Sequence, residues 1–220
     1  MADVVIFGVK DSASLAHFYL KHDSPHRVVA FTVHREYLPA TAKFEGLPVI
    51  PFEELTDHFS PDRVSAFAPM THRKMNRLRE GVYNELRAKG YQLISYVSSR
   101  ATLFPGTPVG DNCFILEGNT IQPFVSIGHN TVMWSGNYIG HHATIGNHVF
   151  IAAHVAVSGH CRVGDYCFLG LNATVRDQVC LAEGTLVGMG TNIRKSTEPW
   201  SLYKADATRA SKISSADIDF

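Results

Sequence analysis

Residues 137–175 read NYIGHHATIGNHVFIAAHVAVSGHCRVGDYCFLGLNATV, and an aliphatic residue returns in this stretch at every sixth position. The register extends in both directions, with an aliphatic residue or methionine at Val97, Leu103, Val109, Ile115, Ile121, Ile127, Met133, Ile139, Ile145, Ile151, Val157, Val163, Leu169, Val175, Leu181, Val187 and Ile193. A period of six fits neither an α-helix nor an alternating strand. It predicts a parallel β-helix, in which each hexad is a short strand plus a corner and three hexads close one triangular coil.

The other hexad positions agree with this prediction. Glycine follows the aliphatic residue at Gly110, Gly128, Gly140, Gly146, Gly164, Gly170 and Gly188. We expect a corner there that needs a positive φ or leaves no room for Cβ. Small or β-branched residues stand four places after the aliphatic residue, as at Cys113, Ala143 and Val155. They suit the inside of a narrow prism whose coils repeat at about 4.8 Å.

The first ninety residues have a different pattern. Residues 4–7 and 27–33 are predicted strands, and the helical spacing between them begins after Asp11 and Ser12, which are candidate N-caps. A strand, a helix and a strand in this order form a βαβ unit and imply a parallel sheet. Residues 45–51 are expected to form a turn into a third short strand, and residues 64–67 a further strand, with a helix beginning at Phe52 between them.

An amphipathic helix is predicted over residues 71–89. Its basic side chains are placed on the solvent side and are Arg73, Lys74, Arg77, Arg79 and Arg87. The chain then divides into a small α/β domain over 1–94, a β-helix over 95–198 and a C-terminal cap and tail over 199–220. In the last segment we expect Pro199, Trp200, Leu202 and Tyr203 to cover the open end of the last coil, whose strand edges would otherwise aggregate.

The composition excludes several classes of protein. Twenty basic and twenty acidic residues cancel, which disfavours nucleic-acid binding and an anionic membrane as partners. The opening residues MADVVIFGVK predict a core strand and not a signal peptide, and no run of 18 apolar residues predicts a membrane helix. Three of the four cysteines occupy the inward position and none forms a C-x-x-C pair, so reduced packing thiols in a cytoplasmic protein are expected.

The loop after the first strand, FGVKDSAS, is where a phosphate would meet the N-terminus of a helix. It has one glycine and does not match G-x-G-x-x-G, and Thr32, Val33 and His34 stand where a dinucleotide site needs an acid. A dinucleotide site is therefore disfavoured. A nucleotide-linked substrate with Lys10 or Ser12 near its phosphate stays open beside a purely structural βαβ unit.

Histidine is the sharper signal, because six of the twelve lie within residues 129–160. His142 and His160 are 18 residues apart, one full coil, and should stack at about 4.8 Å with His141 beside them. Such a cluster suits metal binding or general-base catalysis. No carboxylate or thiol shares this predicted corner, so we expect no metal. A neutral imidazole suits the transfer of an acyl group, which needs a base for the proton of the acceptor.

Residues 137–175 resemble the region IxEH(D/E)CxIGxxxHIxxxAxxxGxxxIGxxxFLGxNAxV of bacterial hexapeptide-repeat sugar acyltransferases. These are the sialic-acid O-acetyltransferase-like proteins and the N-acetyltransferases of nucleotide-linked 4-amino sugars. The resemblance is strong over residues 90–193 and loose over 1–60. It implies a left-handed β-helix after a Rossmann-like α/β domain. It also places the catalytic base at His141, while His142 replaces the acid that follows the base in the family.

The resemblance implies further site residues. Gly159, Leu171 and Met189 match positions that line the acetyl-CoA groove, and Phe150 replaces a histidine that contacts the coenzyme. The substrate loop of the family matches residues 8–14, which supplies Gly8, Lys10 and Ser12 as candidates, and the acidic position after the second strand falls near His34. Family members are trimers with active sites between two prisms.

These observations favour an acetyl-CoA-dependent N-acetyltransferase that acts on a nucleotide-linked amino sugar in surface-polysaccharide (lipopolysaccharide) biosynthesis. It would be a cytoplasmic homotrimer whose α/β domain binds the sugar nucleotide. Three alternatives stay open. One is O-acetylation of a sugar hydroxyl, since one base serves either nucleophile. Another is a non-catalytic hexapeptide-repeat scaffold. The third is a metal-dependent hydratase similar to the γ-carbonic anhydrases.

Overall fold

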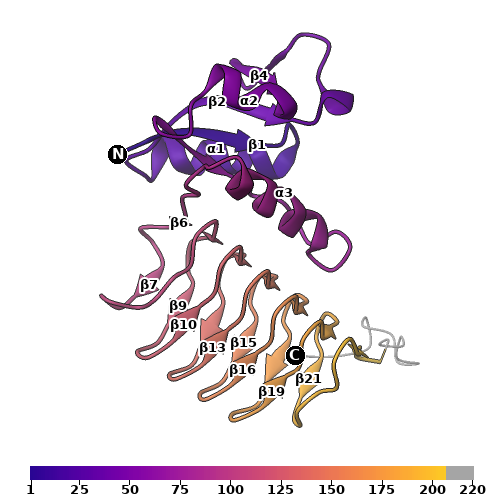
Figure 1. The fold of residues 1–220 in the computed structure, drawn as a ribbon. Coiled ribbons are helices and arrows are strands. Elements are labelled where there is room, and N and C mark those ends of the chain that lie inside the picture. The colour runs from indigo at the N-terminus through magenta and orange to yellow at the C-terminus, as the bar shows by residue number, and fades with distance from the viewer. Residues whose placement is uncertain (207–220) are drawn as a thin grey trace, which may run out of the picture.

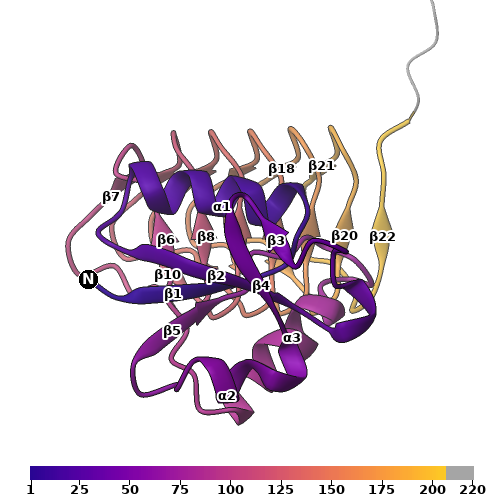
Figure 2. The ribbon, with the colours of Figure 1, turned by 90° about the horizontal axis from the view of Figure 1, so that it is seen from above.

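The computed structural model of the chain describes residues 1–206, so the predicted tail from 207 to 220 lies outside the described residues. An α/β layer comes first and packs on a long prism (Figures 1 and 2). Its elements are β1 (Asp3–Phe7), α1 (Asp11–His22), β2 (Arg27–Val33), η1 (Arg35–Tyr37), β3 (Lys43–Phe44), β4 (Leu47–Pro51), η2 (Phe52–Glu54), α2 (Leu55–His58), β5 (Val64–Phe67) and α3 (Arg77–Ala88). None of the helices within residues 1–206 is long and apolar enough to cross a membrane.

The prism is built from two-residue strands, and each ends on a residue of the period-six register. They are β6 (Tyr96–Val97), β7 (Thr102–Leu103), β8 (Phe114–Ile115), β9 (Thr120–Ile121), β10 (Ser126–Ile127), β11 (Val132–Met133), β12 (Tyr138–Ile139), β13 (Thr144–Ile145), β14 (Phe150–Ile151), β15 (Ala156–Val157), β16 (Arg162–Val163), β17 (Phe168–Leu169), β18 (Thr174–Val175), β19 (Cys180–Leu181), β20 (Leu186–Val187) and β21 (Asn192–Ile193). Val109 pairs with Ile127 in an isolated parallel bridge. The predicted parallel β-helix is confirmed, and its left-handed sense stays an expectation.

Three parallel sheets form the faces of the prism. The four-stranded face has the order β10-β13-β16-β19, and the six-stranded face has the order β21-β18-β15-β12-β9-β7. The seven-stranded face runs β22-β20-β17-β14-β11-β8-β6 and ends on β22 (Leu202–Tyr203), which pairs with β20. The C-terminal segment therefore adds a strand to one face, and Trp200 lies against Gly184 of the last coils.

The core of the prism consists of the periodic residues and the small residues four places later, as predicted. Cys113, Ala143, Cys161 and Cys167 are fully buried among the aliphatic side chains. The glycines after the aliphatic residue are needed for space and not for a positive φ. A Cβ on Gly140, for example, would lie 2.5 Å from the backbone nitrogen of Gly159 in the next coil.

Positive φ occurs three places after the aliphatic residue, once in each hexad from residue 106 to residue 190, and the three resulting columns define the edges of the prism. Edge A, between the four- and seven-stranded faces, consists of Asn112, Asn130, His148, Tyr166 and Gly184. Edge B, between the seven- and six-stranded faces, consists of Gly118, Gly136, His154, Asn172 and Gly190. Edge C, between the six- and four-stranded faces, consists of Gly106, Phe124, His142, His160 and Gln178.

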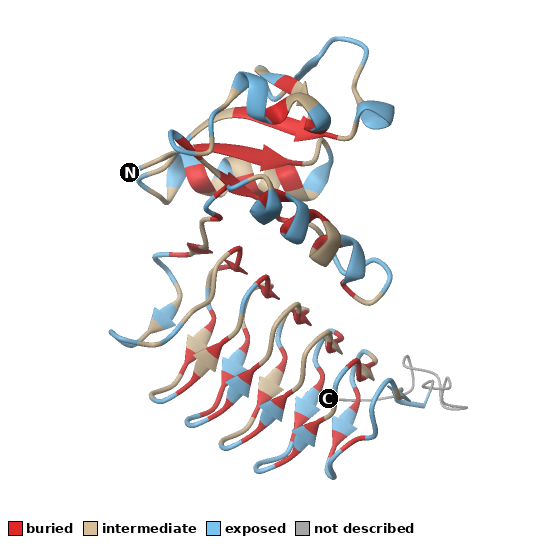
Figure 3. Ribbon diagram, viewed as in Figure 1, coloured by how far each residue is buried: buried red, intermediate tan, exposed pale blue. Residues whose placement is uncertain are grey.

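The α/β layer confirms the predicted parallel sheet. Its strand order is β3-β4-β2-β1-β5, with β1, β2, β4 and β5 parallel and only the β3–β4 pair antiparallel. The strands β1 and β2 are largely buried (Figure 3). Residues of β1 and α1 share one apolar cluster with Phe114, Val132 and Phe150 of the seven-stranded face. The assignment of this layer as Rossmann-like stays a prediction. So do the domain bounds, which are 1–94, 95–198 and 199–220.

The junction between the two parts is polar. The carboxylate of Asp23, after α1, accepts hydrogen bonds from the Tyr96 hydroxyl at 2.6 Å, the Ser98 hydroxyl at 2.9 Å and the Ser99 backbone N–H at 3.0 Å. The bonds from Ser99 and Tyr96 hold the pKa of Asp23 well below its usual range. They fix the end of α1 to the first coil.

The predicted helix over residues 71–89 is shorter in the structure, since α3 spans Arg77–Ala88. Lys74, Met75 and Asn76 have positive φ values of 52°, 50° and 67° and form a left-handed turn before it. Arg79, which the sequence places in solvent, is fully buried. Arg79 is buried because α3 lies over edge A, where its guanidinium donates hydrogen bonds to backbone carbonyls of the prism.

The start of α1 also differs from the prediction. Asp11 and Ser12 are expected as N-caps, but Lys10 occupies the N-cap position and the helix begins at Asp11. Asp11 in the first turn still complements the helix dipole.

Candidate active site

His141, His142 and His160 form an exposed cluster at edge C. One ligand-type atom of each histidine lies within 4.8 Å of the others. The rings of His142 and His160 are stacked with centroids 4.8 Å apart and 14° between planes, which confirms the predicted stacking. The ring of His141 stands almost perpendicular to both of them.

The repeat itself brings these side chains together. His142 and His160 both adopt the left-handed corner conformation, with φ of 60° and 57°, and follow each other at one coil. Their side chains therefore leave the edge in the same direction. Phe124, one coil earlier in the same column, packs on His142 with ring centroids 4.6 Å apart. His142 is thus held between Phe124 and His160.

His141 is positioned by three contacts. Its backbone N–H donates a hydrogen bond to Oε1 of Gln122 at 3.0 Å. Its Nδ1 lies 3.1 Å from Nδ1 of His142, a hydrogen bond in which one of the two nitrogens carries the proton. Its ring also covers Gly159, where a Cβ would lie 2.9 Å from Cε1 and 3.0 Å from Nε2 of His141. Gly159 therefore leaves space for the imidazole.

This arrangement can act in proton transfer. When Nδ1 of His141 donates to Nδ1 of His142, the Nε2 of His141 keeps a lone pair for an incoming proton. His142 fixes that tautomer as a neutral partner, without the negative charge that a carboxylate would add. Edge C thus presents an exposed, oriented imidazole whose partner is itself held by ring stacking.

The coenzyme residues implied by the resemblance do not all meet at edge C. Gly159 lies directly under His141. Leu171 and Met189 are 39% and 68% exposed and stand next to edge B, at the other side of the six-stranded face. Phe150 is only 5% exposed, because it stacks on Phe168 and makes an edge-to-face contact with His72 beneath the α/β layer. Phe150 therefore has almost no surface to offer a cofactor in this chain.

The predicted substrate residues gather at the carboxyl ends of β1 and β2. Gly8 has a φ of 118° and donates a backbone hydrogen bond to Thr32 at 2.9 Å. His34 lies near Phe7, with ring centroids 5.6 Å apart, and its Nδ1 is 3.1 Å from Glu53. Together with Arg35, Glu36 and Glu53 it lines a shallow depression of about 480 Å³.

Lys10 and Ser12 stand at the first turn of α1, beside this edge of the sheet. In Glu53, the residue's own backbone N–H and the contacts from His34 and Arg35 lower the carboxyl pKa despite partial burial. The α/β layer covers the seven-stranded face, whereas edge C joins the other two faces. The substrate residues and His141 of one chain are therefore on different sides of the prism.

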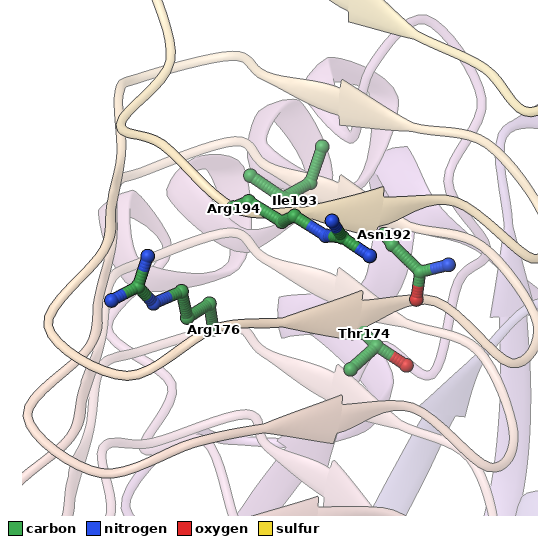
Figure 4. A pocket seen from close by; sticks show the side chains of 5 residues that line it. All are labelled: Thr174, Arg176, Asn192, Ile193 and Arg194. Atoms are coloured by element: carbon green, nitrogen blue, oxygen red, sulfur yellow. The ribbon is translucent and has the colours of Figure 1, made fainter.

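A basic pocket on the six-stranded face was not predicted from the sequence. Arg176 and Arg194 stand one coil apart and line it with Thr174, Asn192 and Ile193 (Figure 4). Both arginines stand at the edge C end of their strands, two and three coils beyond the coil of His141. The side chain of Arg176 points away from Asn192, whereas that of Arg194 runs back across the face toward Asn192 (Figure 4). Their 18-residue spacing is the same signal that located the histidines, and it could have found them.

A family profile described as "Bacterial transferase hexapeptide (six repeats)" matches residues 142–177, the coils that carry His142 and His160. The matched residues are a run of hexapeptide repeats. None of the curated protein sequences compared with it matches at a significant level.

Solved structures with the same fold cover nearly the whole chain. The acetyltransferase domain of PglB from Neisseria gonorrhoeae has a TM-score of 0.79 and 17% identity, over 93% of this chain and 97% of that one. A variant of perosamine N-acetyltransferase from Caulobacter crescentus, in complex with CoA and GDP-perosamine, has a TM-score of 0.80 and 21% identity, over 93% and 94%. WeeI from Acinetobacter baumannii has a TM-score of 0.76 and 16% identity, over 92% and 96%. At these identities the likeness shows that this chain shares their fold over both of its parts.

Proposed function

We propose that this protein is an acetyl-CoA-dependent N-acetyltransferase that acts on a nucleotide-linked amino sugar. One observation carries the proposal: His141 is an exposed imidazole held by Nδ1 of His142 over a glycine of the next coil. The names of the structural neighbours support it, since they include an acetyltransferase domain and a perosamine N-acetyltransferase bound to CoA and GDP-perosamine. The synthesis of surface polysaccharide is the process in which such a product would be used.

In the proposed reaction, Nε2 of His141 accepts a proton from the amino group of the sugar as the nitrogen attacks the acetyl carbonyl. The new C–N bond forms, the C–S bond breaks, and coenzyme A leaves as a thiol after taking up a proton. The developing oxyanion needs a hydrogen-bond donor. The backbone N–H of Gly159 is our candidate, because this residue lies against the ring of the base.

The basic pocket fits the phosphates of the coenzyme. Guanidinium groups bind phosphates through paired hydrogen bonds. With coils repeating at about 4.8 Å, Arg176 and Arg194 lie roughly 10 and 14 Å along the prism axis from the level of His141. An extended acetyl-CoA would therefore place its acetyl group at edge C and its phosphates toward the C-terminal coils.

The proposal needs a second copy of the chain. Leu171 and Met189 lie beside edge B, while His141 lies at edge C of the same prism. A homotrimer in which edge B of one chain faces edge C of the next would bring them together. It would also bring the α/β layer of one chain, with its candidate substrate residues Gly8 and His34, near the base of another. Exposed Phe124 and Tyr138 would be covered by such contacts.

The deciding experiment is thiol release from acetyl-CoA with a panel of UDP-, dTDP- and GDP-linked amino sugars, run with the wild-type chain and His141→Asn. We expect turnover on at least one amino sugar and a loss of about 10²–10⁴-fold in His141→Asn, the usual contribution of a general base. The matched control is His129→Asn, which changes an exposed histidine beside edge A, the edge that takes no part in the proposed contact between chains.

The outcomes separate the alternatives. Turnover that survives in His141→Asn would contradict the role of this base. Silence with every amino sugar, combined with release of thiol when a sugar hydroxyl is the acceptor, would replace the proposal by O-acetylation. Silence with no binding of coenzyme A would leave a non-catalytic scaffold.

A further inference from the structure

The three histidines at edge C also have the composition of a transition-metal site. Imidazole nitrogen is a preferred ligand of Zn²⁺, Cu²⁺ and Ni²⁺. The ligand-type atoms of His141, His142 and His160 lie within 4.8 Å of one another. No metal was expected from the sequence, because no carboxylate or thiol shares this corner. In the structure the ligand-type atoms of the three histidines alone come close enough to suggest a shared ion.

The distances suit a single ion after small side-chain movements. Tetrahedral zinc with Zn–N bonds of about 2.0–2.1 Å places its ligand nitrogens about 3.4 Å apart. Nδ1 of His141 and Nδ1 of His142 are already 3.1 Å apart. His160 is exposed and has to rotate out of its stack on His142 to bring a nitrogen closer. Three protein nitrogens would leave a fourth position of the ion open to solvent.

We propose that His141, His142 and His160 bind one divalent transition-metal ion of the Zn²⁺ class, and that this ion switches off the base. The inhibitory part rests on the proposed function. A neutral imidazole carries one proton on its two nitrogens. If Nδ1 of His141 binds the ion, its proton resides on Nε2, and if Nε2 binds, that lone pair is occupied. In both cases His141 loses the nitrogen that would accept the proton of the substrate.

The test uses the untagged full chain and titrates Zn²⁺ by isothermal calorimetry. The key variant is His160→Gln, which the fold should accept, because Gln178 occupies the same corner of the next coil with φ of 61°. The matched control is His129→Gln, which changes an exposed histidine beside edge A, away from edge C and from the edge B that would face it in a trimer. We expect one Zn²⁺ per chain in the wild type and the control, and an affinity at least about tenfold lower in His160→Gln.

Equal affinity for Zn²⁺ in His160→Gln and the wild type would overturn the site, and so would the absence of saturable binding in the wild type. Circular dichroism of each variant shows that the prism is folded. The inhibitory role is measured separately, as thiol release with and without Zn²⁺, with each variant normalised to its own metal-free rate. Inhibition of the wild type at Zn²⁺ concentrations that spare His160→Gln supports the role, and activation by Zn²⁺ overturns it.

These measurements keep the two proposals distinguishable. Calorimetry reports the metal site even if no acceptor sugar gives turnover. Conversely, turnover that depends on His141 in a chain without Zn²⁺ affinity supports the enzyme and rejects the metal site.

Discussion

Edges A and C of the prism have the same backbone and opposite surroundings. Each is a column of residues with positive φ, repeated at one coil, and each contains histidine. At edge A the corner side chains Asn112 and Asn130 are buried under α3. At edge C His142 and His160 are exposed to solvent. The same backbone conformation therefore serves a structural role at edge A and forms the candidate site at edge C.

Edge A is closed by hydrogen bonds. Nδ2 of Asn112 donates to Oδ1 of Asn130 at 2.8 Å, and Nδ2 of Asn130 lies 2.9 Å from Nδ1 of His148. Arg79 of α3 donates from its three nitrogens to the backbone carbonyls of Met70, Thr71, Asn130, His148 and Val149 and to Oδ1 of Asn76. Burial lowers the pKa of Arg79 to about 9, which still leaves it charged at neutral pH.

The difference shows what makes a repeated corner available for chemistry. The ladder at edge A uses its polar atoms to attach one part of the molecule to another. At edge C the imidazoles contact mainly one another and Phe124, and their remaining nitrogens face solvent. An unused polar group on a rigid corner is what a site needs, and three predictions test this contrast.

The largest expected effect is the loss of Arg79. In Arg79→Ala we expect the free energy of unfolding to fall by about 3–5 kcal/mol, because buried carbonyls lose their donors and a cavity remains. Chemical denaturation followed by circular dichroism measures this change. The control is Arg77→Ala, since Arg77 is exposed and lies over the rings of Tyr166 and Trp200 at about 5 Å. It should cost only about 0.5–1 kcal/mol.

If Arg79→Ala and Arg77→Ala lower the free energy of unfolding equally, the buried contacts at edge A contribute no more to stability than an exposed surface contact. The contrast between the edges would then be one of burial alone. A loss confined to α3, with the prism intact in hydrogen exchange, would instead place the role of Arg79 in docking this helix.

The second prediction concerns Gly159 at edge C. A Cβ on this residue would contact the ring of His141 and not the backbone of another coil. In Gly159→Ala we therefore expect the imidazole to move, with turnover about 100-fold lower and a free energy of unfolding changed by less than about 1 kcal/mol. The substitution keeps the backbone N–H, so an oxyanion contact would remain. Steady-state thiol release and thermal melting measure the two effects.

Gly140→Ala is the matched control, because its Cβ would lie 2.5 Å from the backbone nitrogen of Gly159. Gly140→Ala should mainly lower the free energy of unfolding. Unchanged turnover in Gly159→Ala would mean that the position of His141 is unimportant for the reaction. A loss of stability equal to that of Gly140→Ala would mean that Gly159 supports the coil.

The prism could be predicted from the sequence because every hexad repeats the same side-chain demand, so seventeen positions report one geometry. The same repetition predicted the stacking of His142 on His160 from an 18-residue spacing. Of the two reasons expected for the glycines after the aliphatic residues, the lack of room for Cβ is confirmed, whereas positive φ occurs two residues later. These glycines are required by the approach of the next coil, while asparagine at residues 112, 130 and 172 was the signal for positive φ.

The burial of Arg79 could not be read from the helix that contains it. An arginine among exposed charges has the pattern of a solvated side chain, and only the packing of α3 on edge A supplies its acceptors. The left-handed turn at residues 74–76 was equally hard to predict, because Lys74 and Met75 are not residues that favour positive φ. At the candidate site, the resemblance pointed to Gly159 as a coenzyme contact, and only the structure shows that it lies under His141.

The smallest expected effect is the pH dependence of edge A. Burial is the main cause that lowers the pKa of His148, which Arg79 and His129 lower further and Glu80 and Asp165 oppose. The folded state therefore resists protonation. Below about pH 6.5, the usual value for histidine, the unfolded chain binds the proton more tightly, and stability is lost as the pH falls through the lowered pKa of the folded state. Protonation would also remove the acceptor of Asn130.

His148→Asn tests this argument. Asparagine favours the φ of 58° at this corner, and its Oδ1 can accept from Asn130, as Asn130 does from Asn112 one coil earlier. We expect the variant to unfold at nearly the same denaturant concentration as the wild type at pH 7.5, and to lose less stability between pH 7 and pH 5. His142→Asn makes the same substitution at exposed edge C and should keep the acid sensitivity of the wild type. If both variants reduce the acid-induced loss of stability equally, that loss does not come from His148 at edge A. The hydrogen-bonded side chains of edge A would then be no more sensitive to charge than the exposed cluster at edge C.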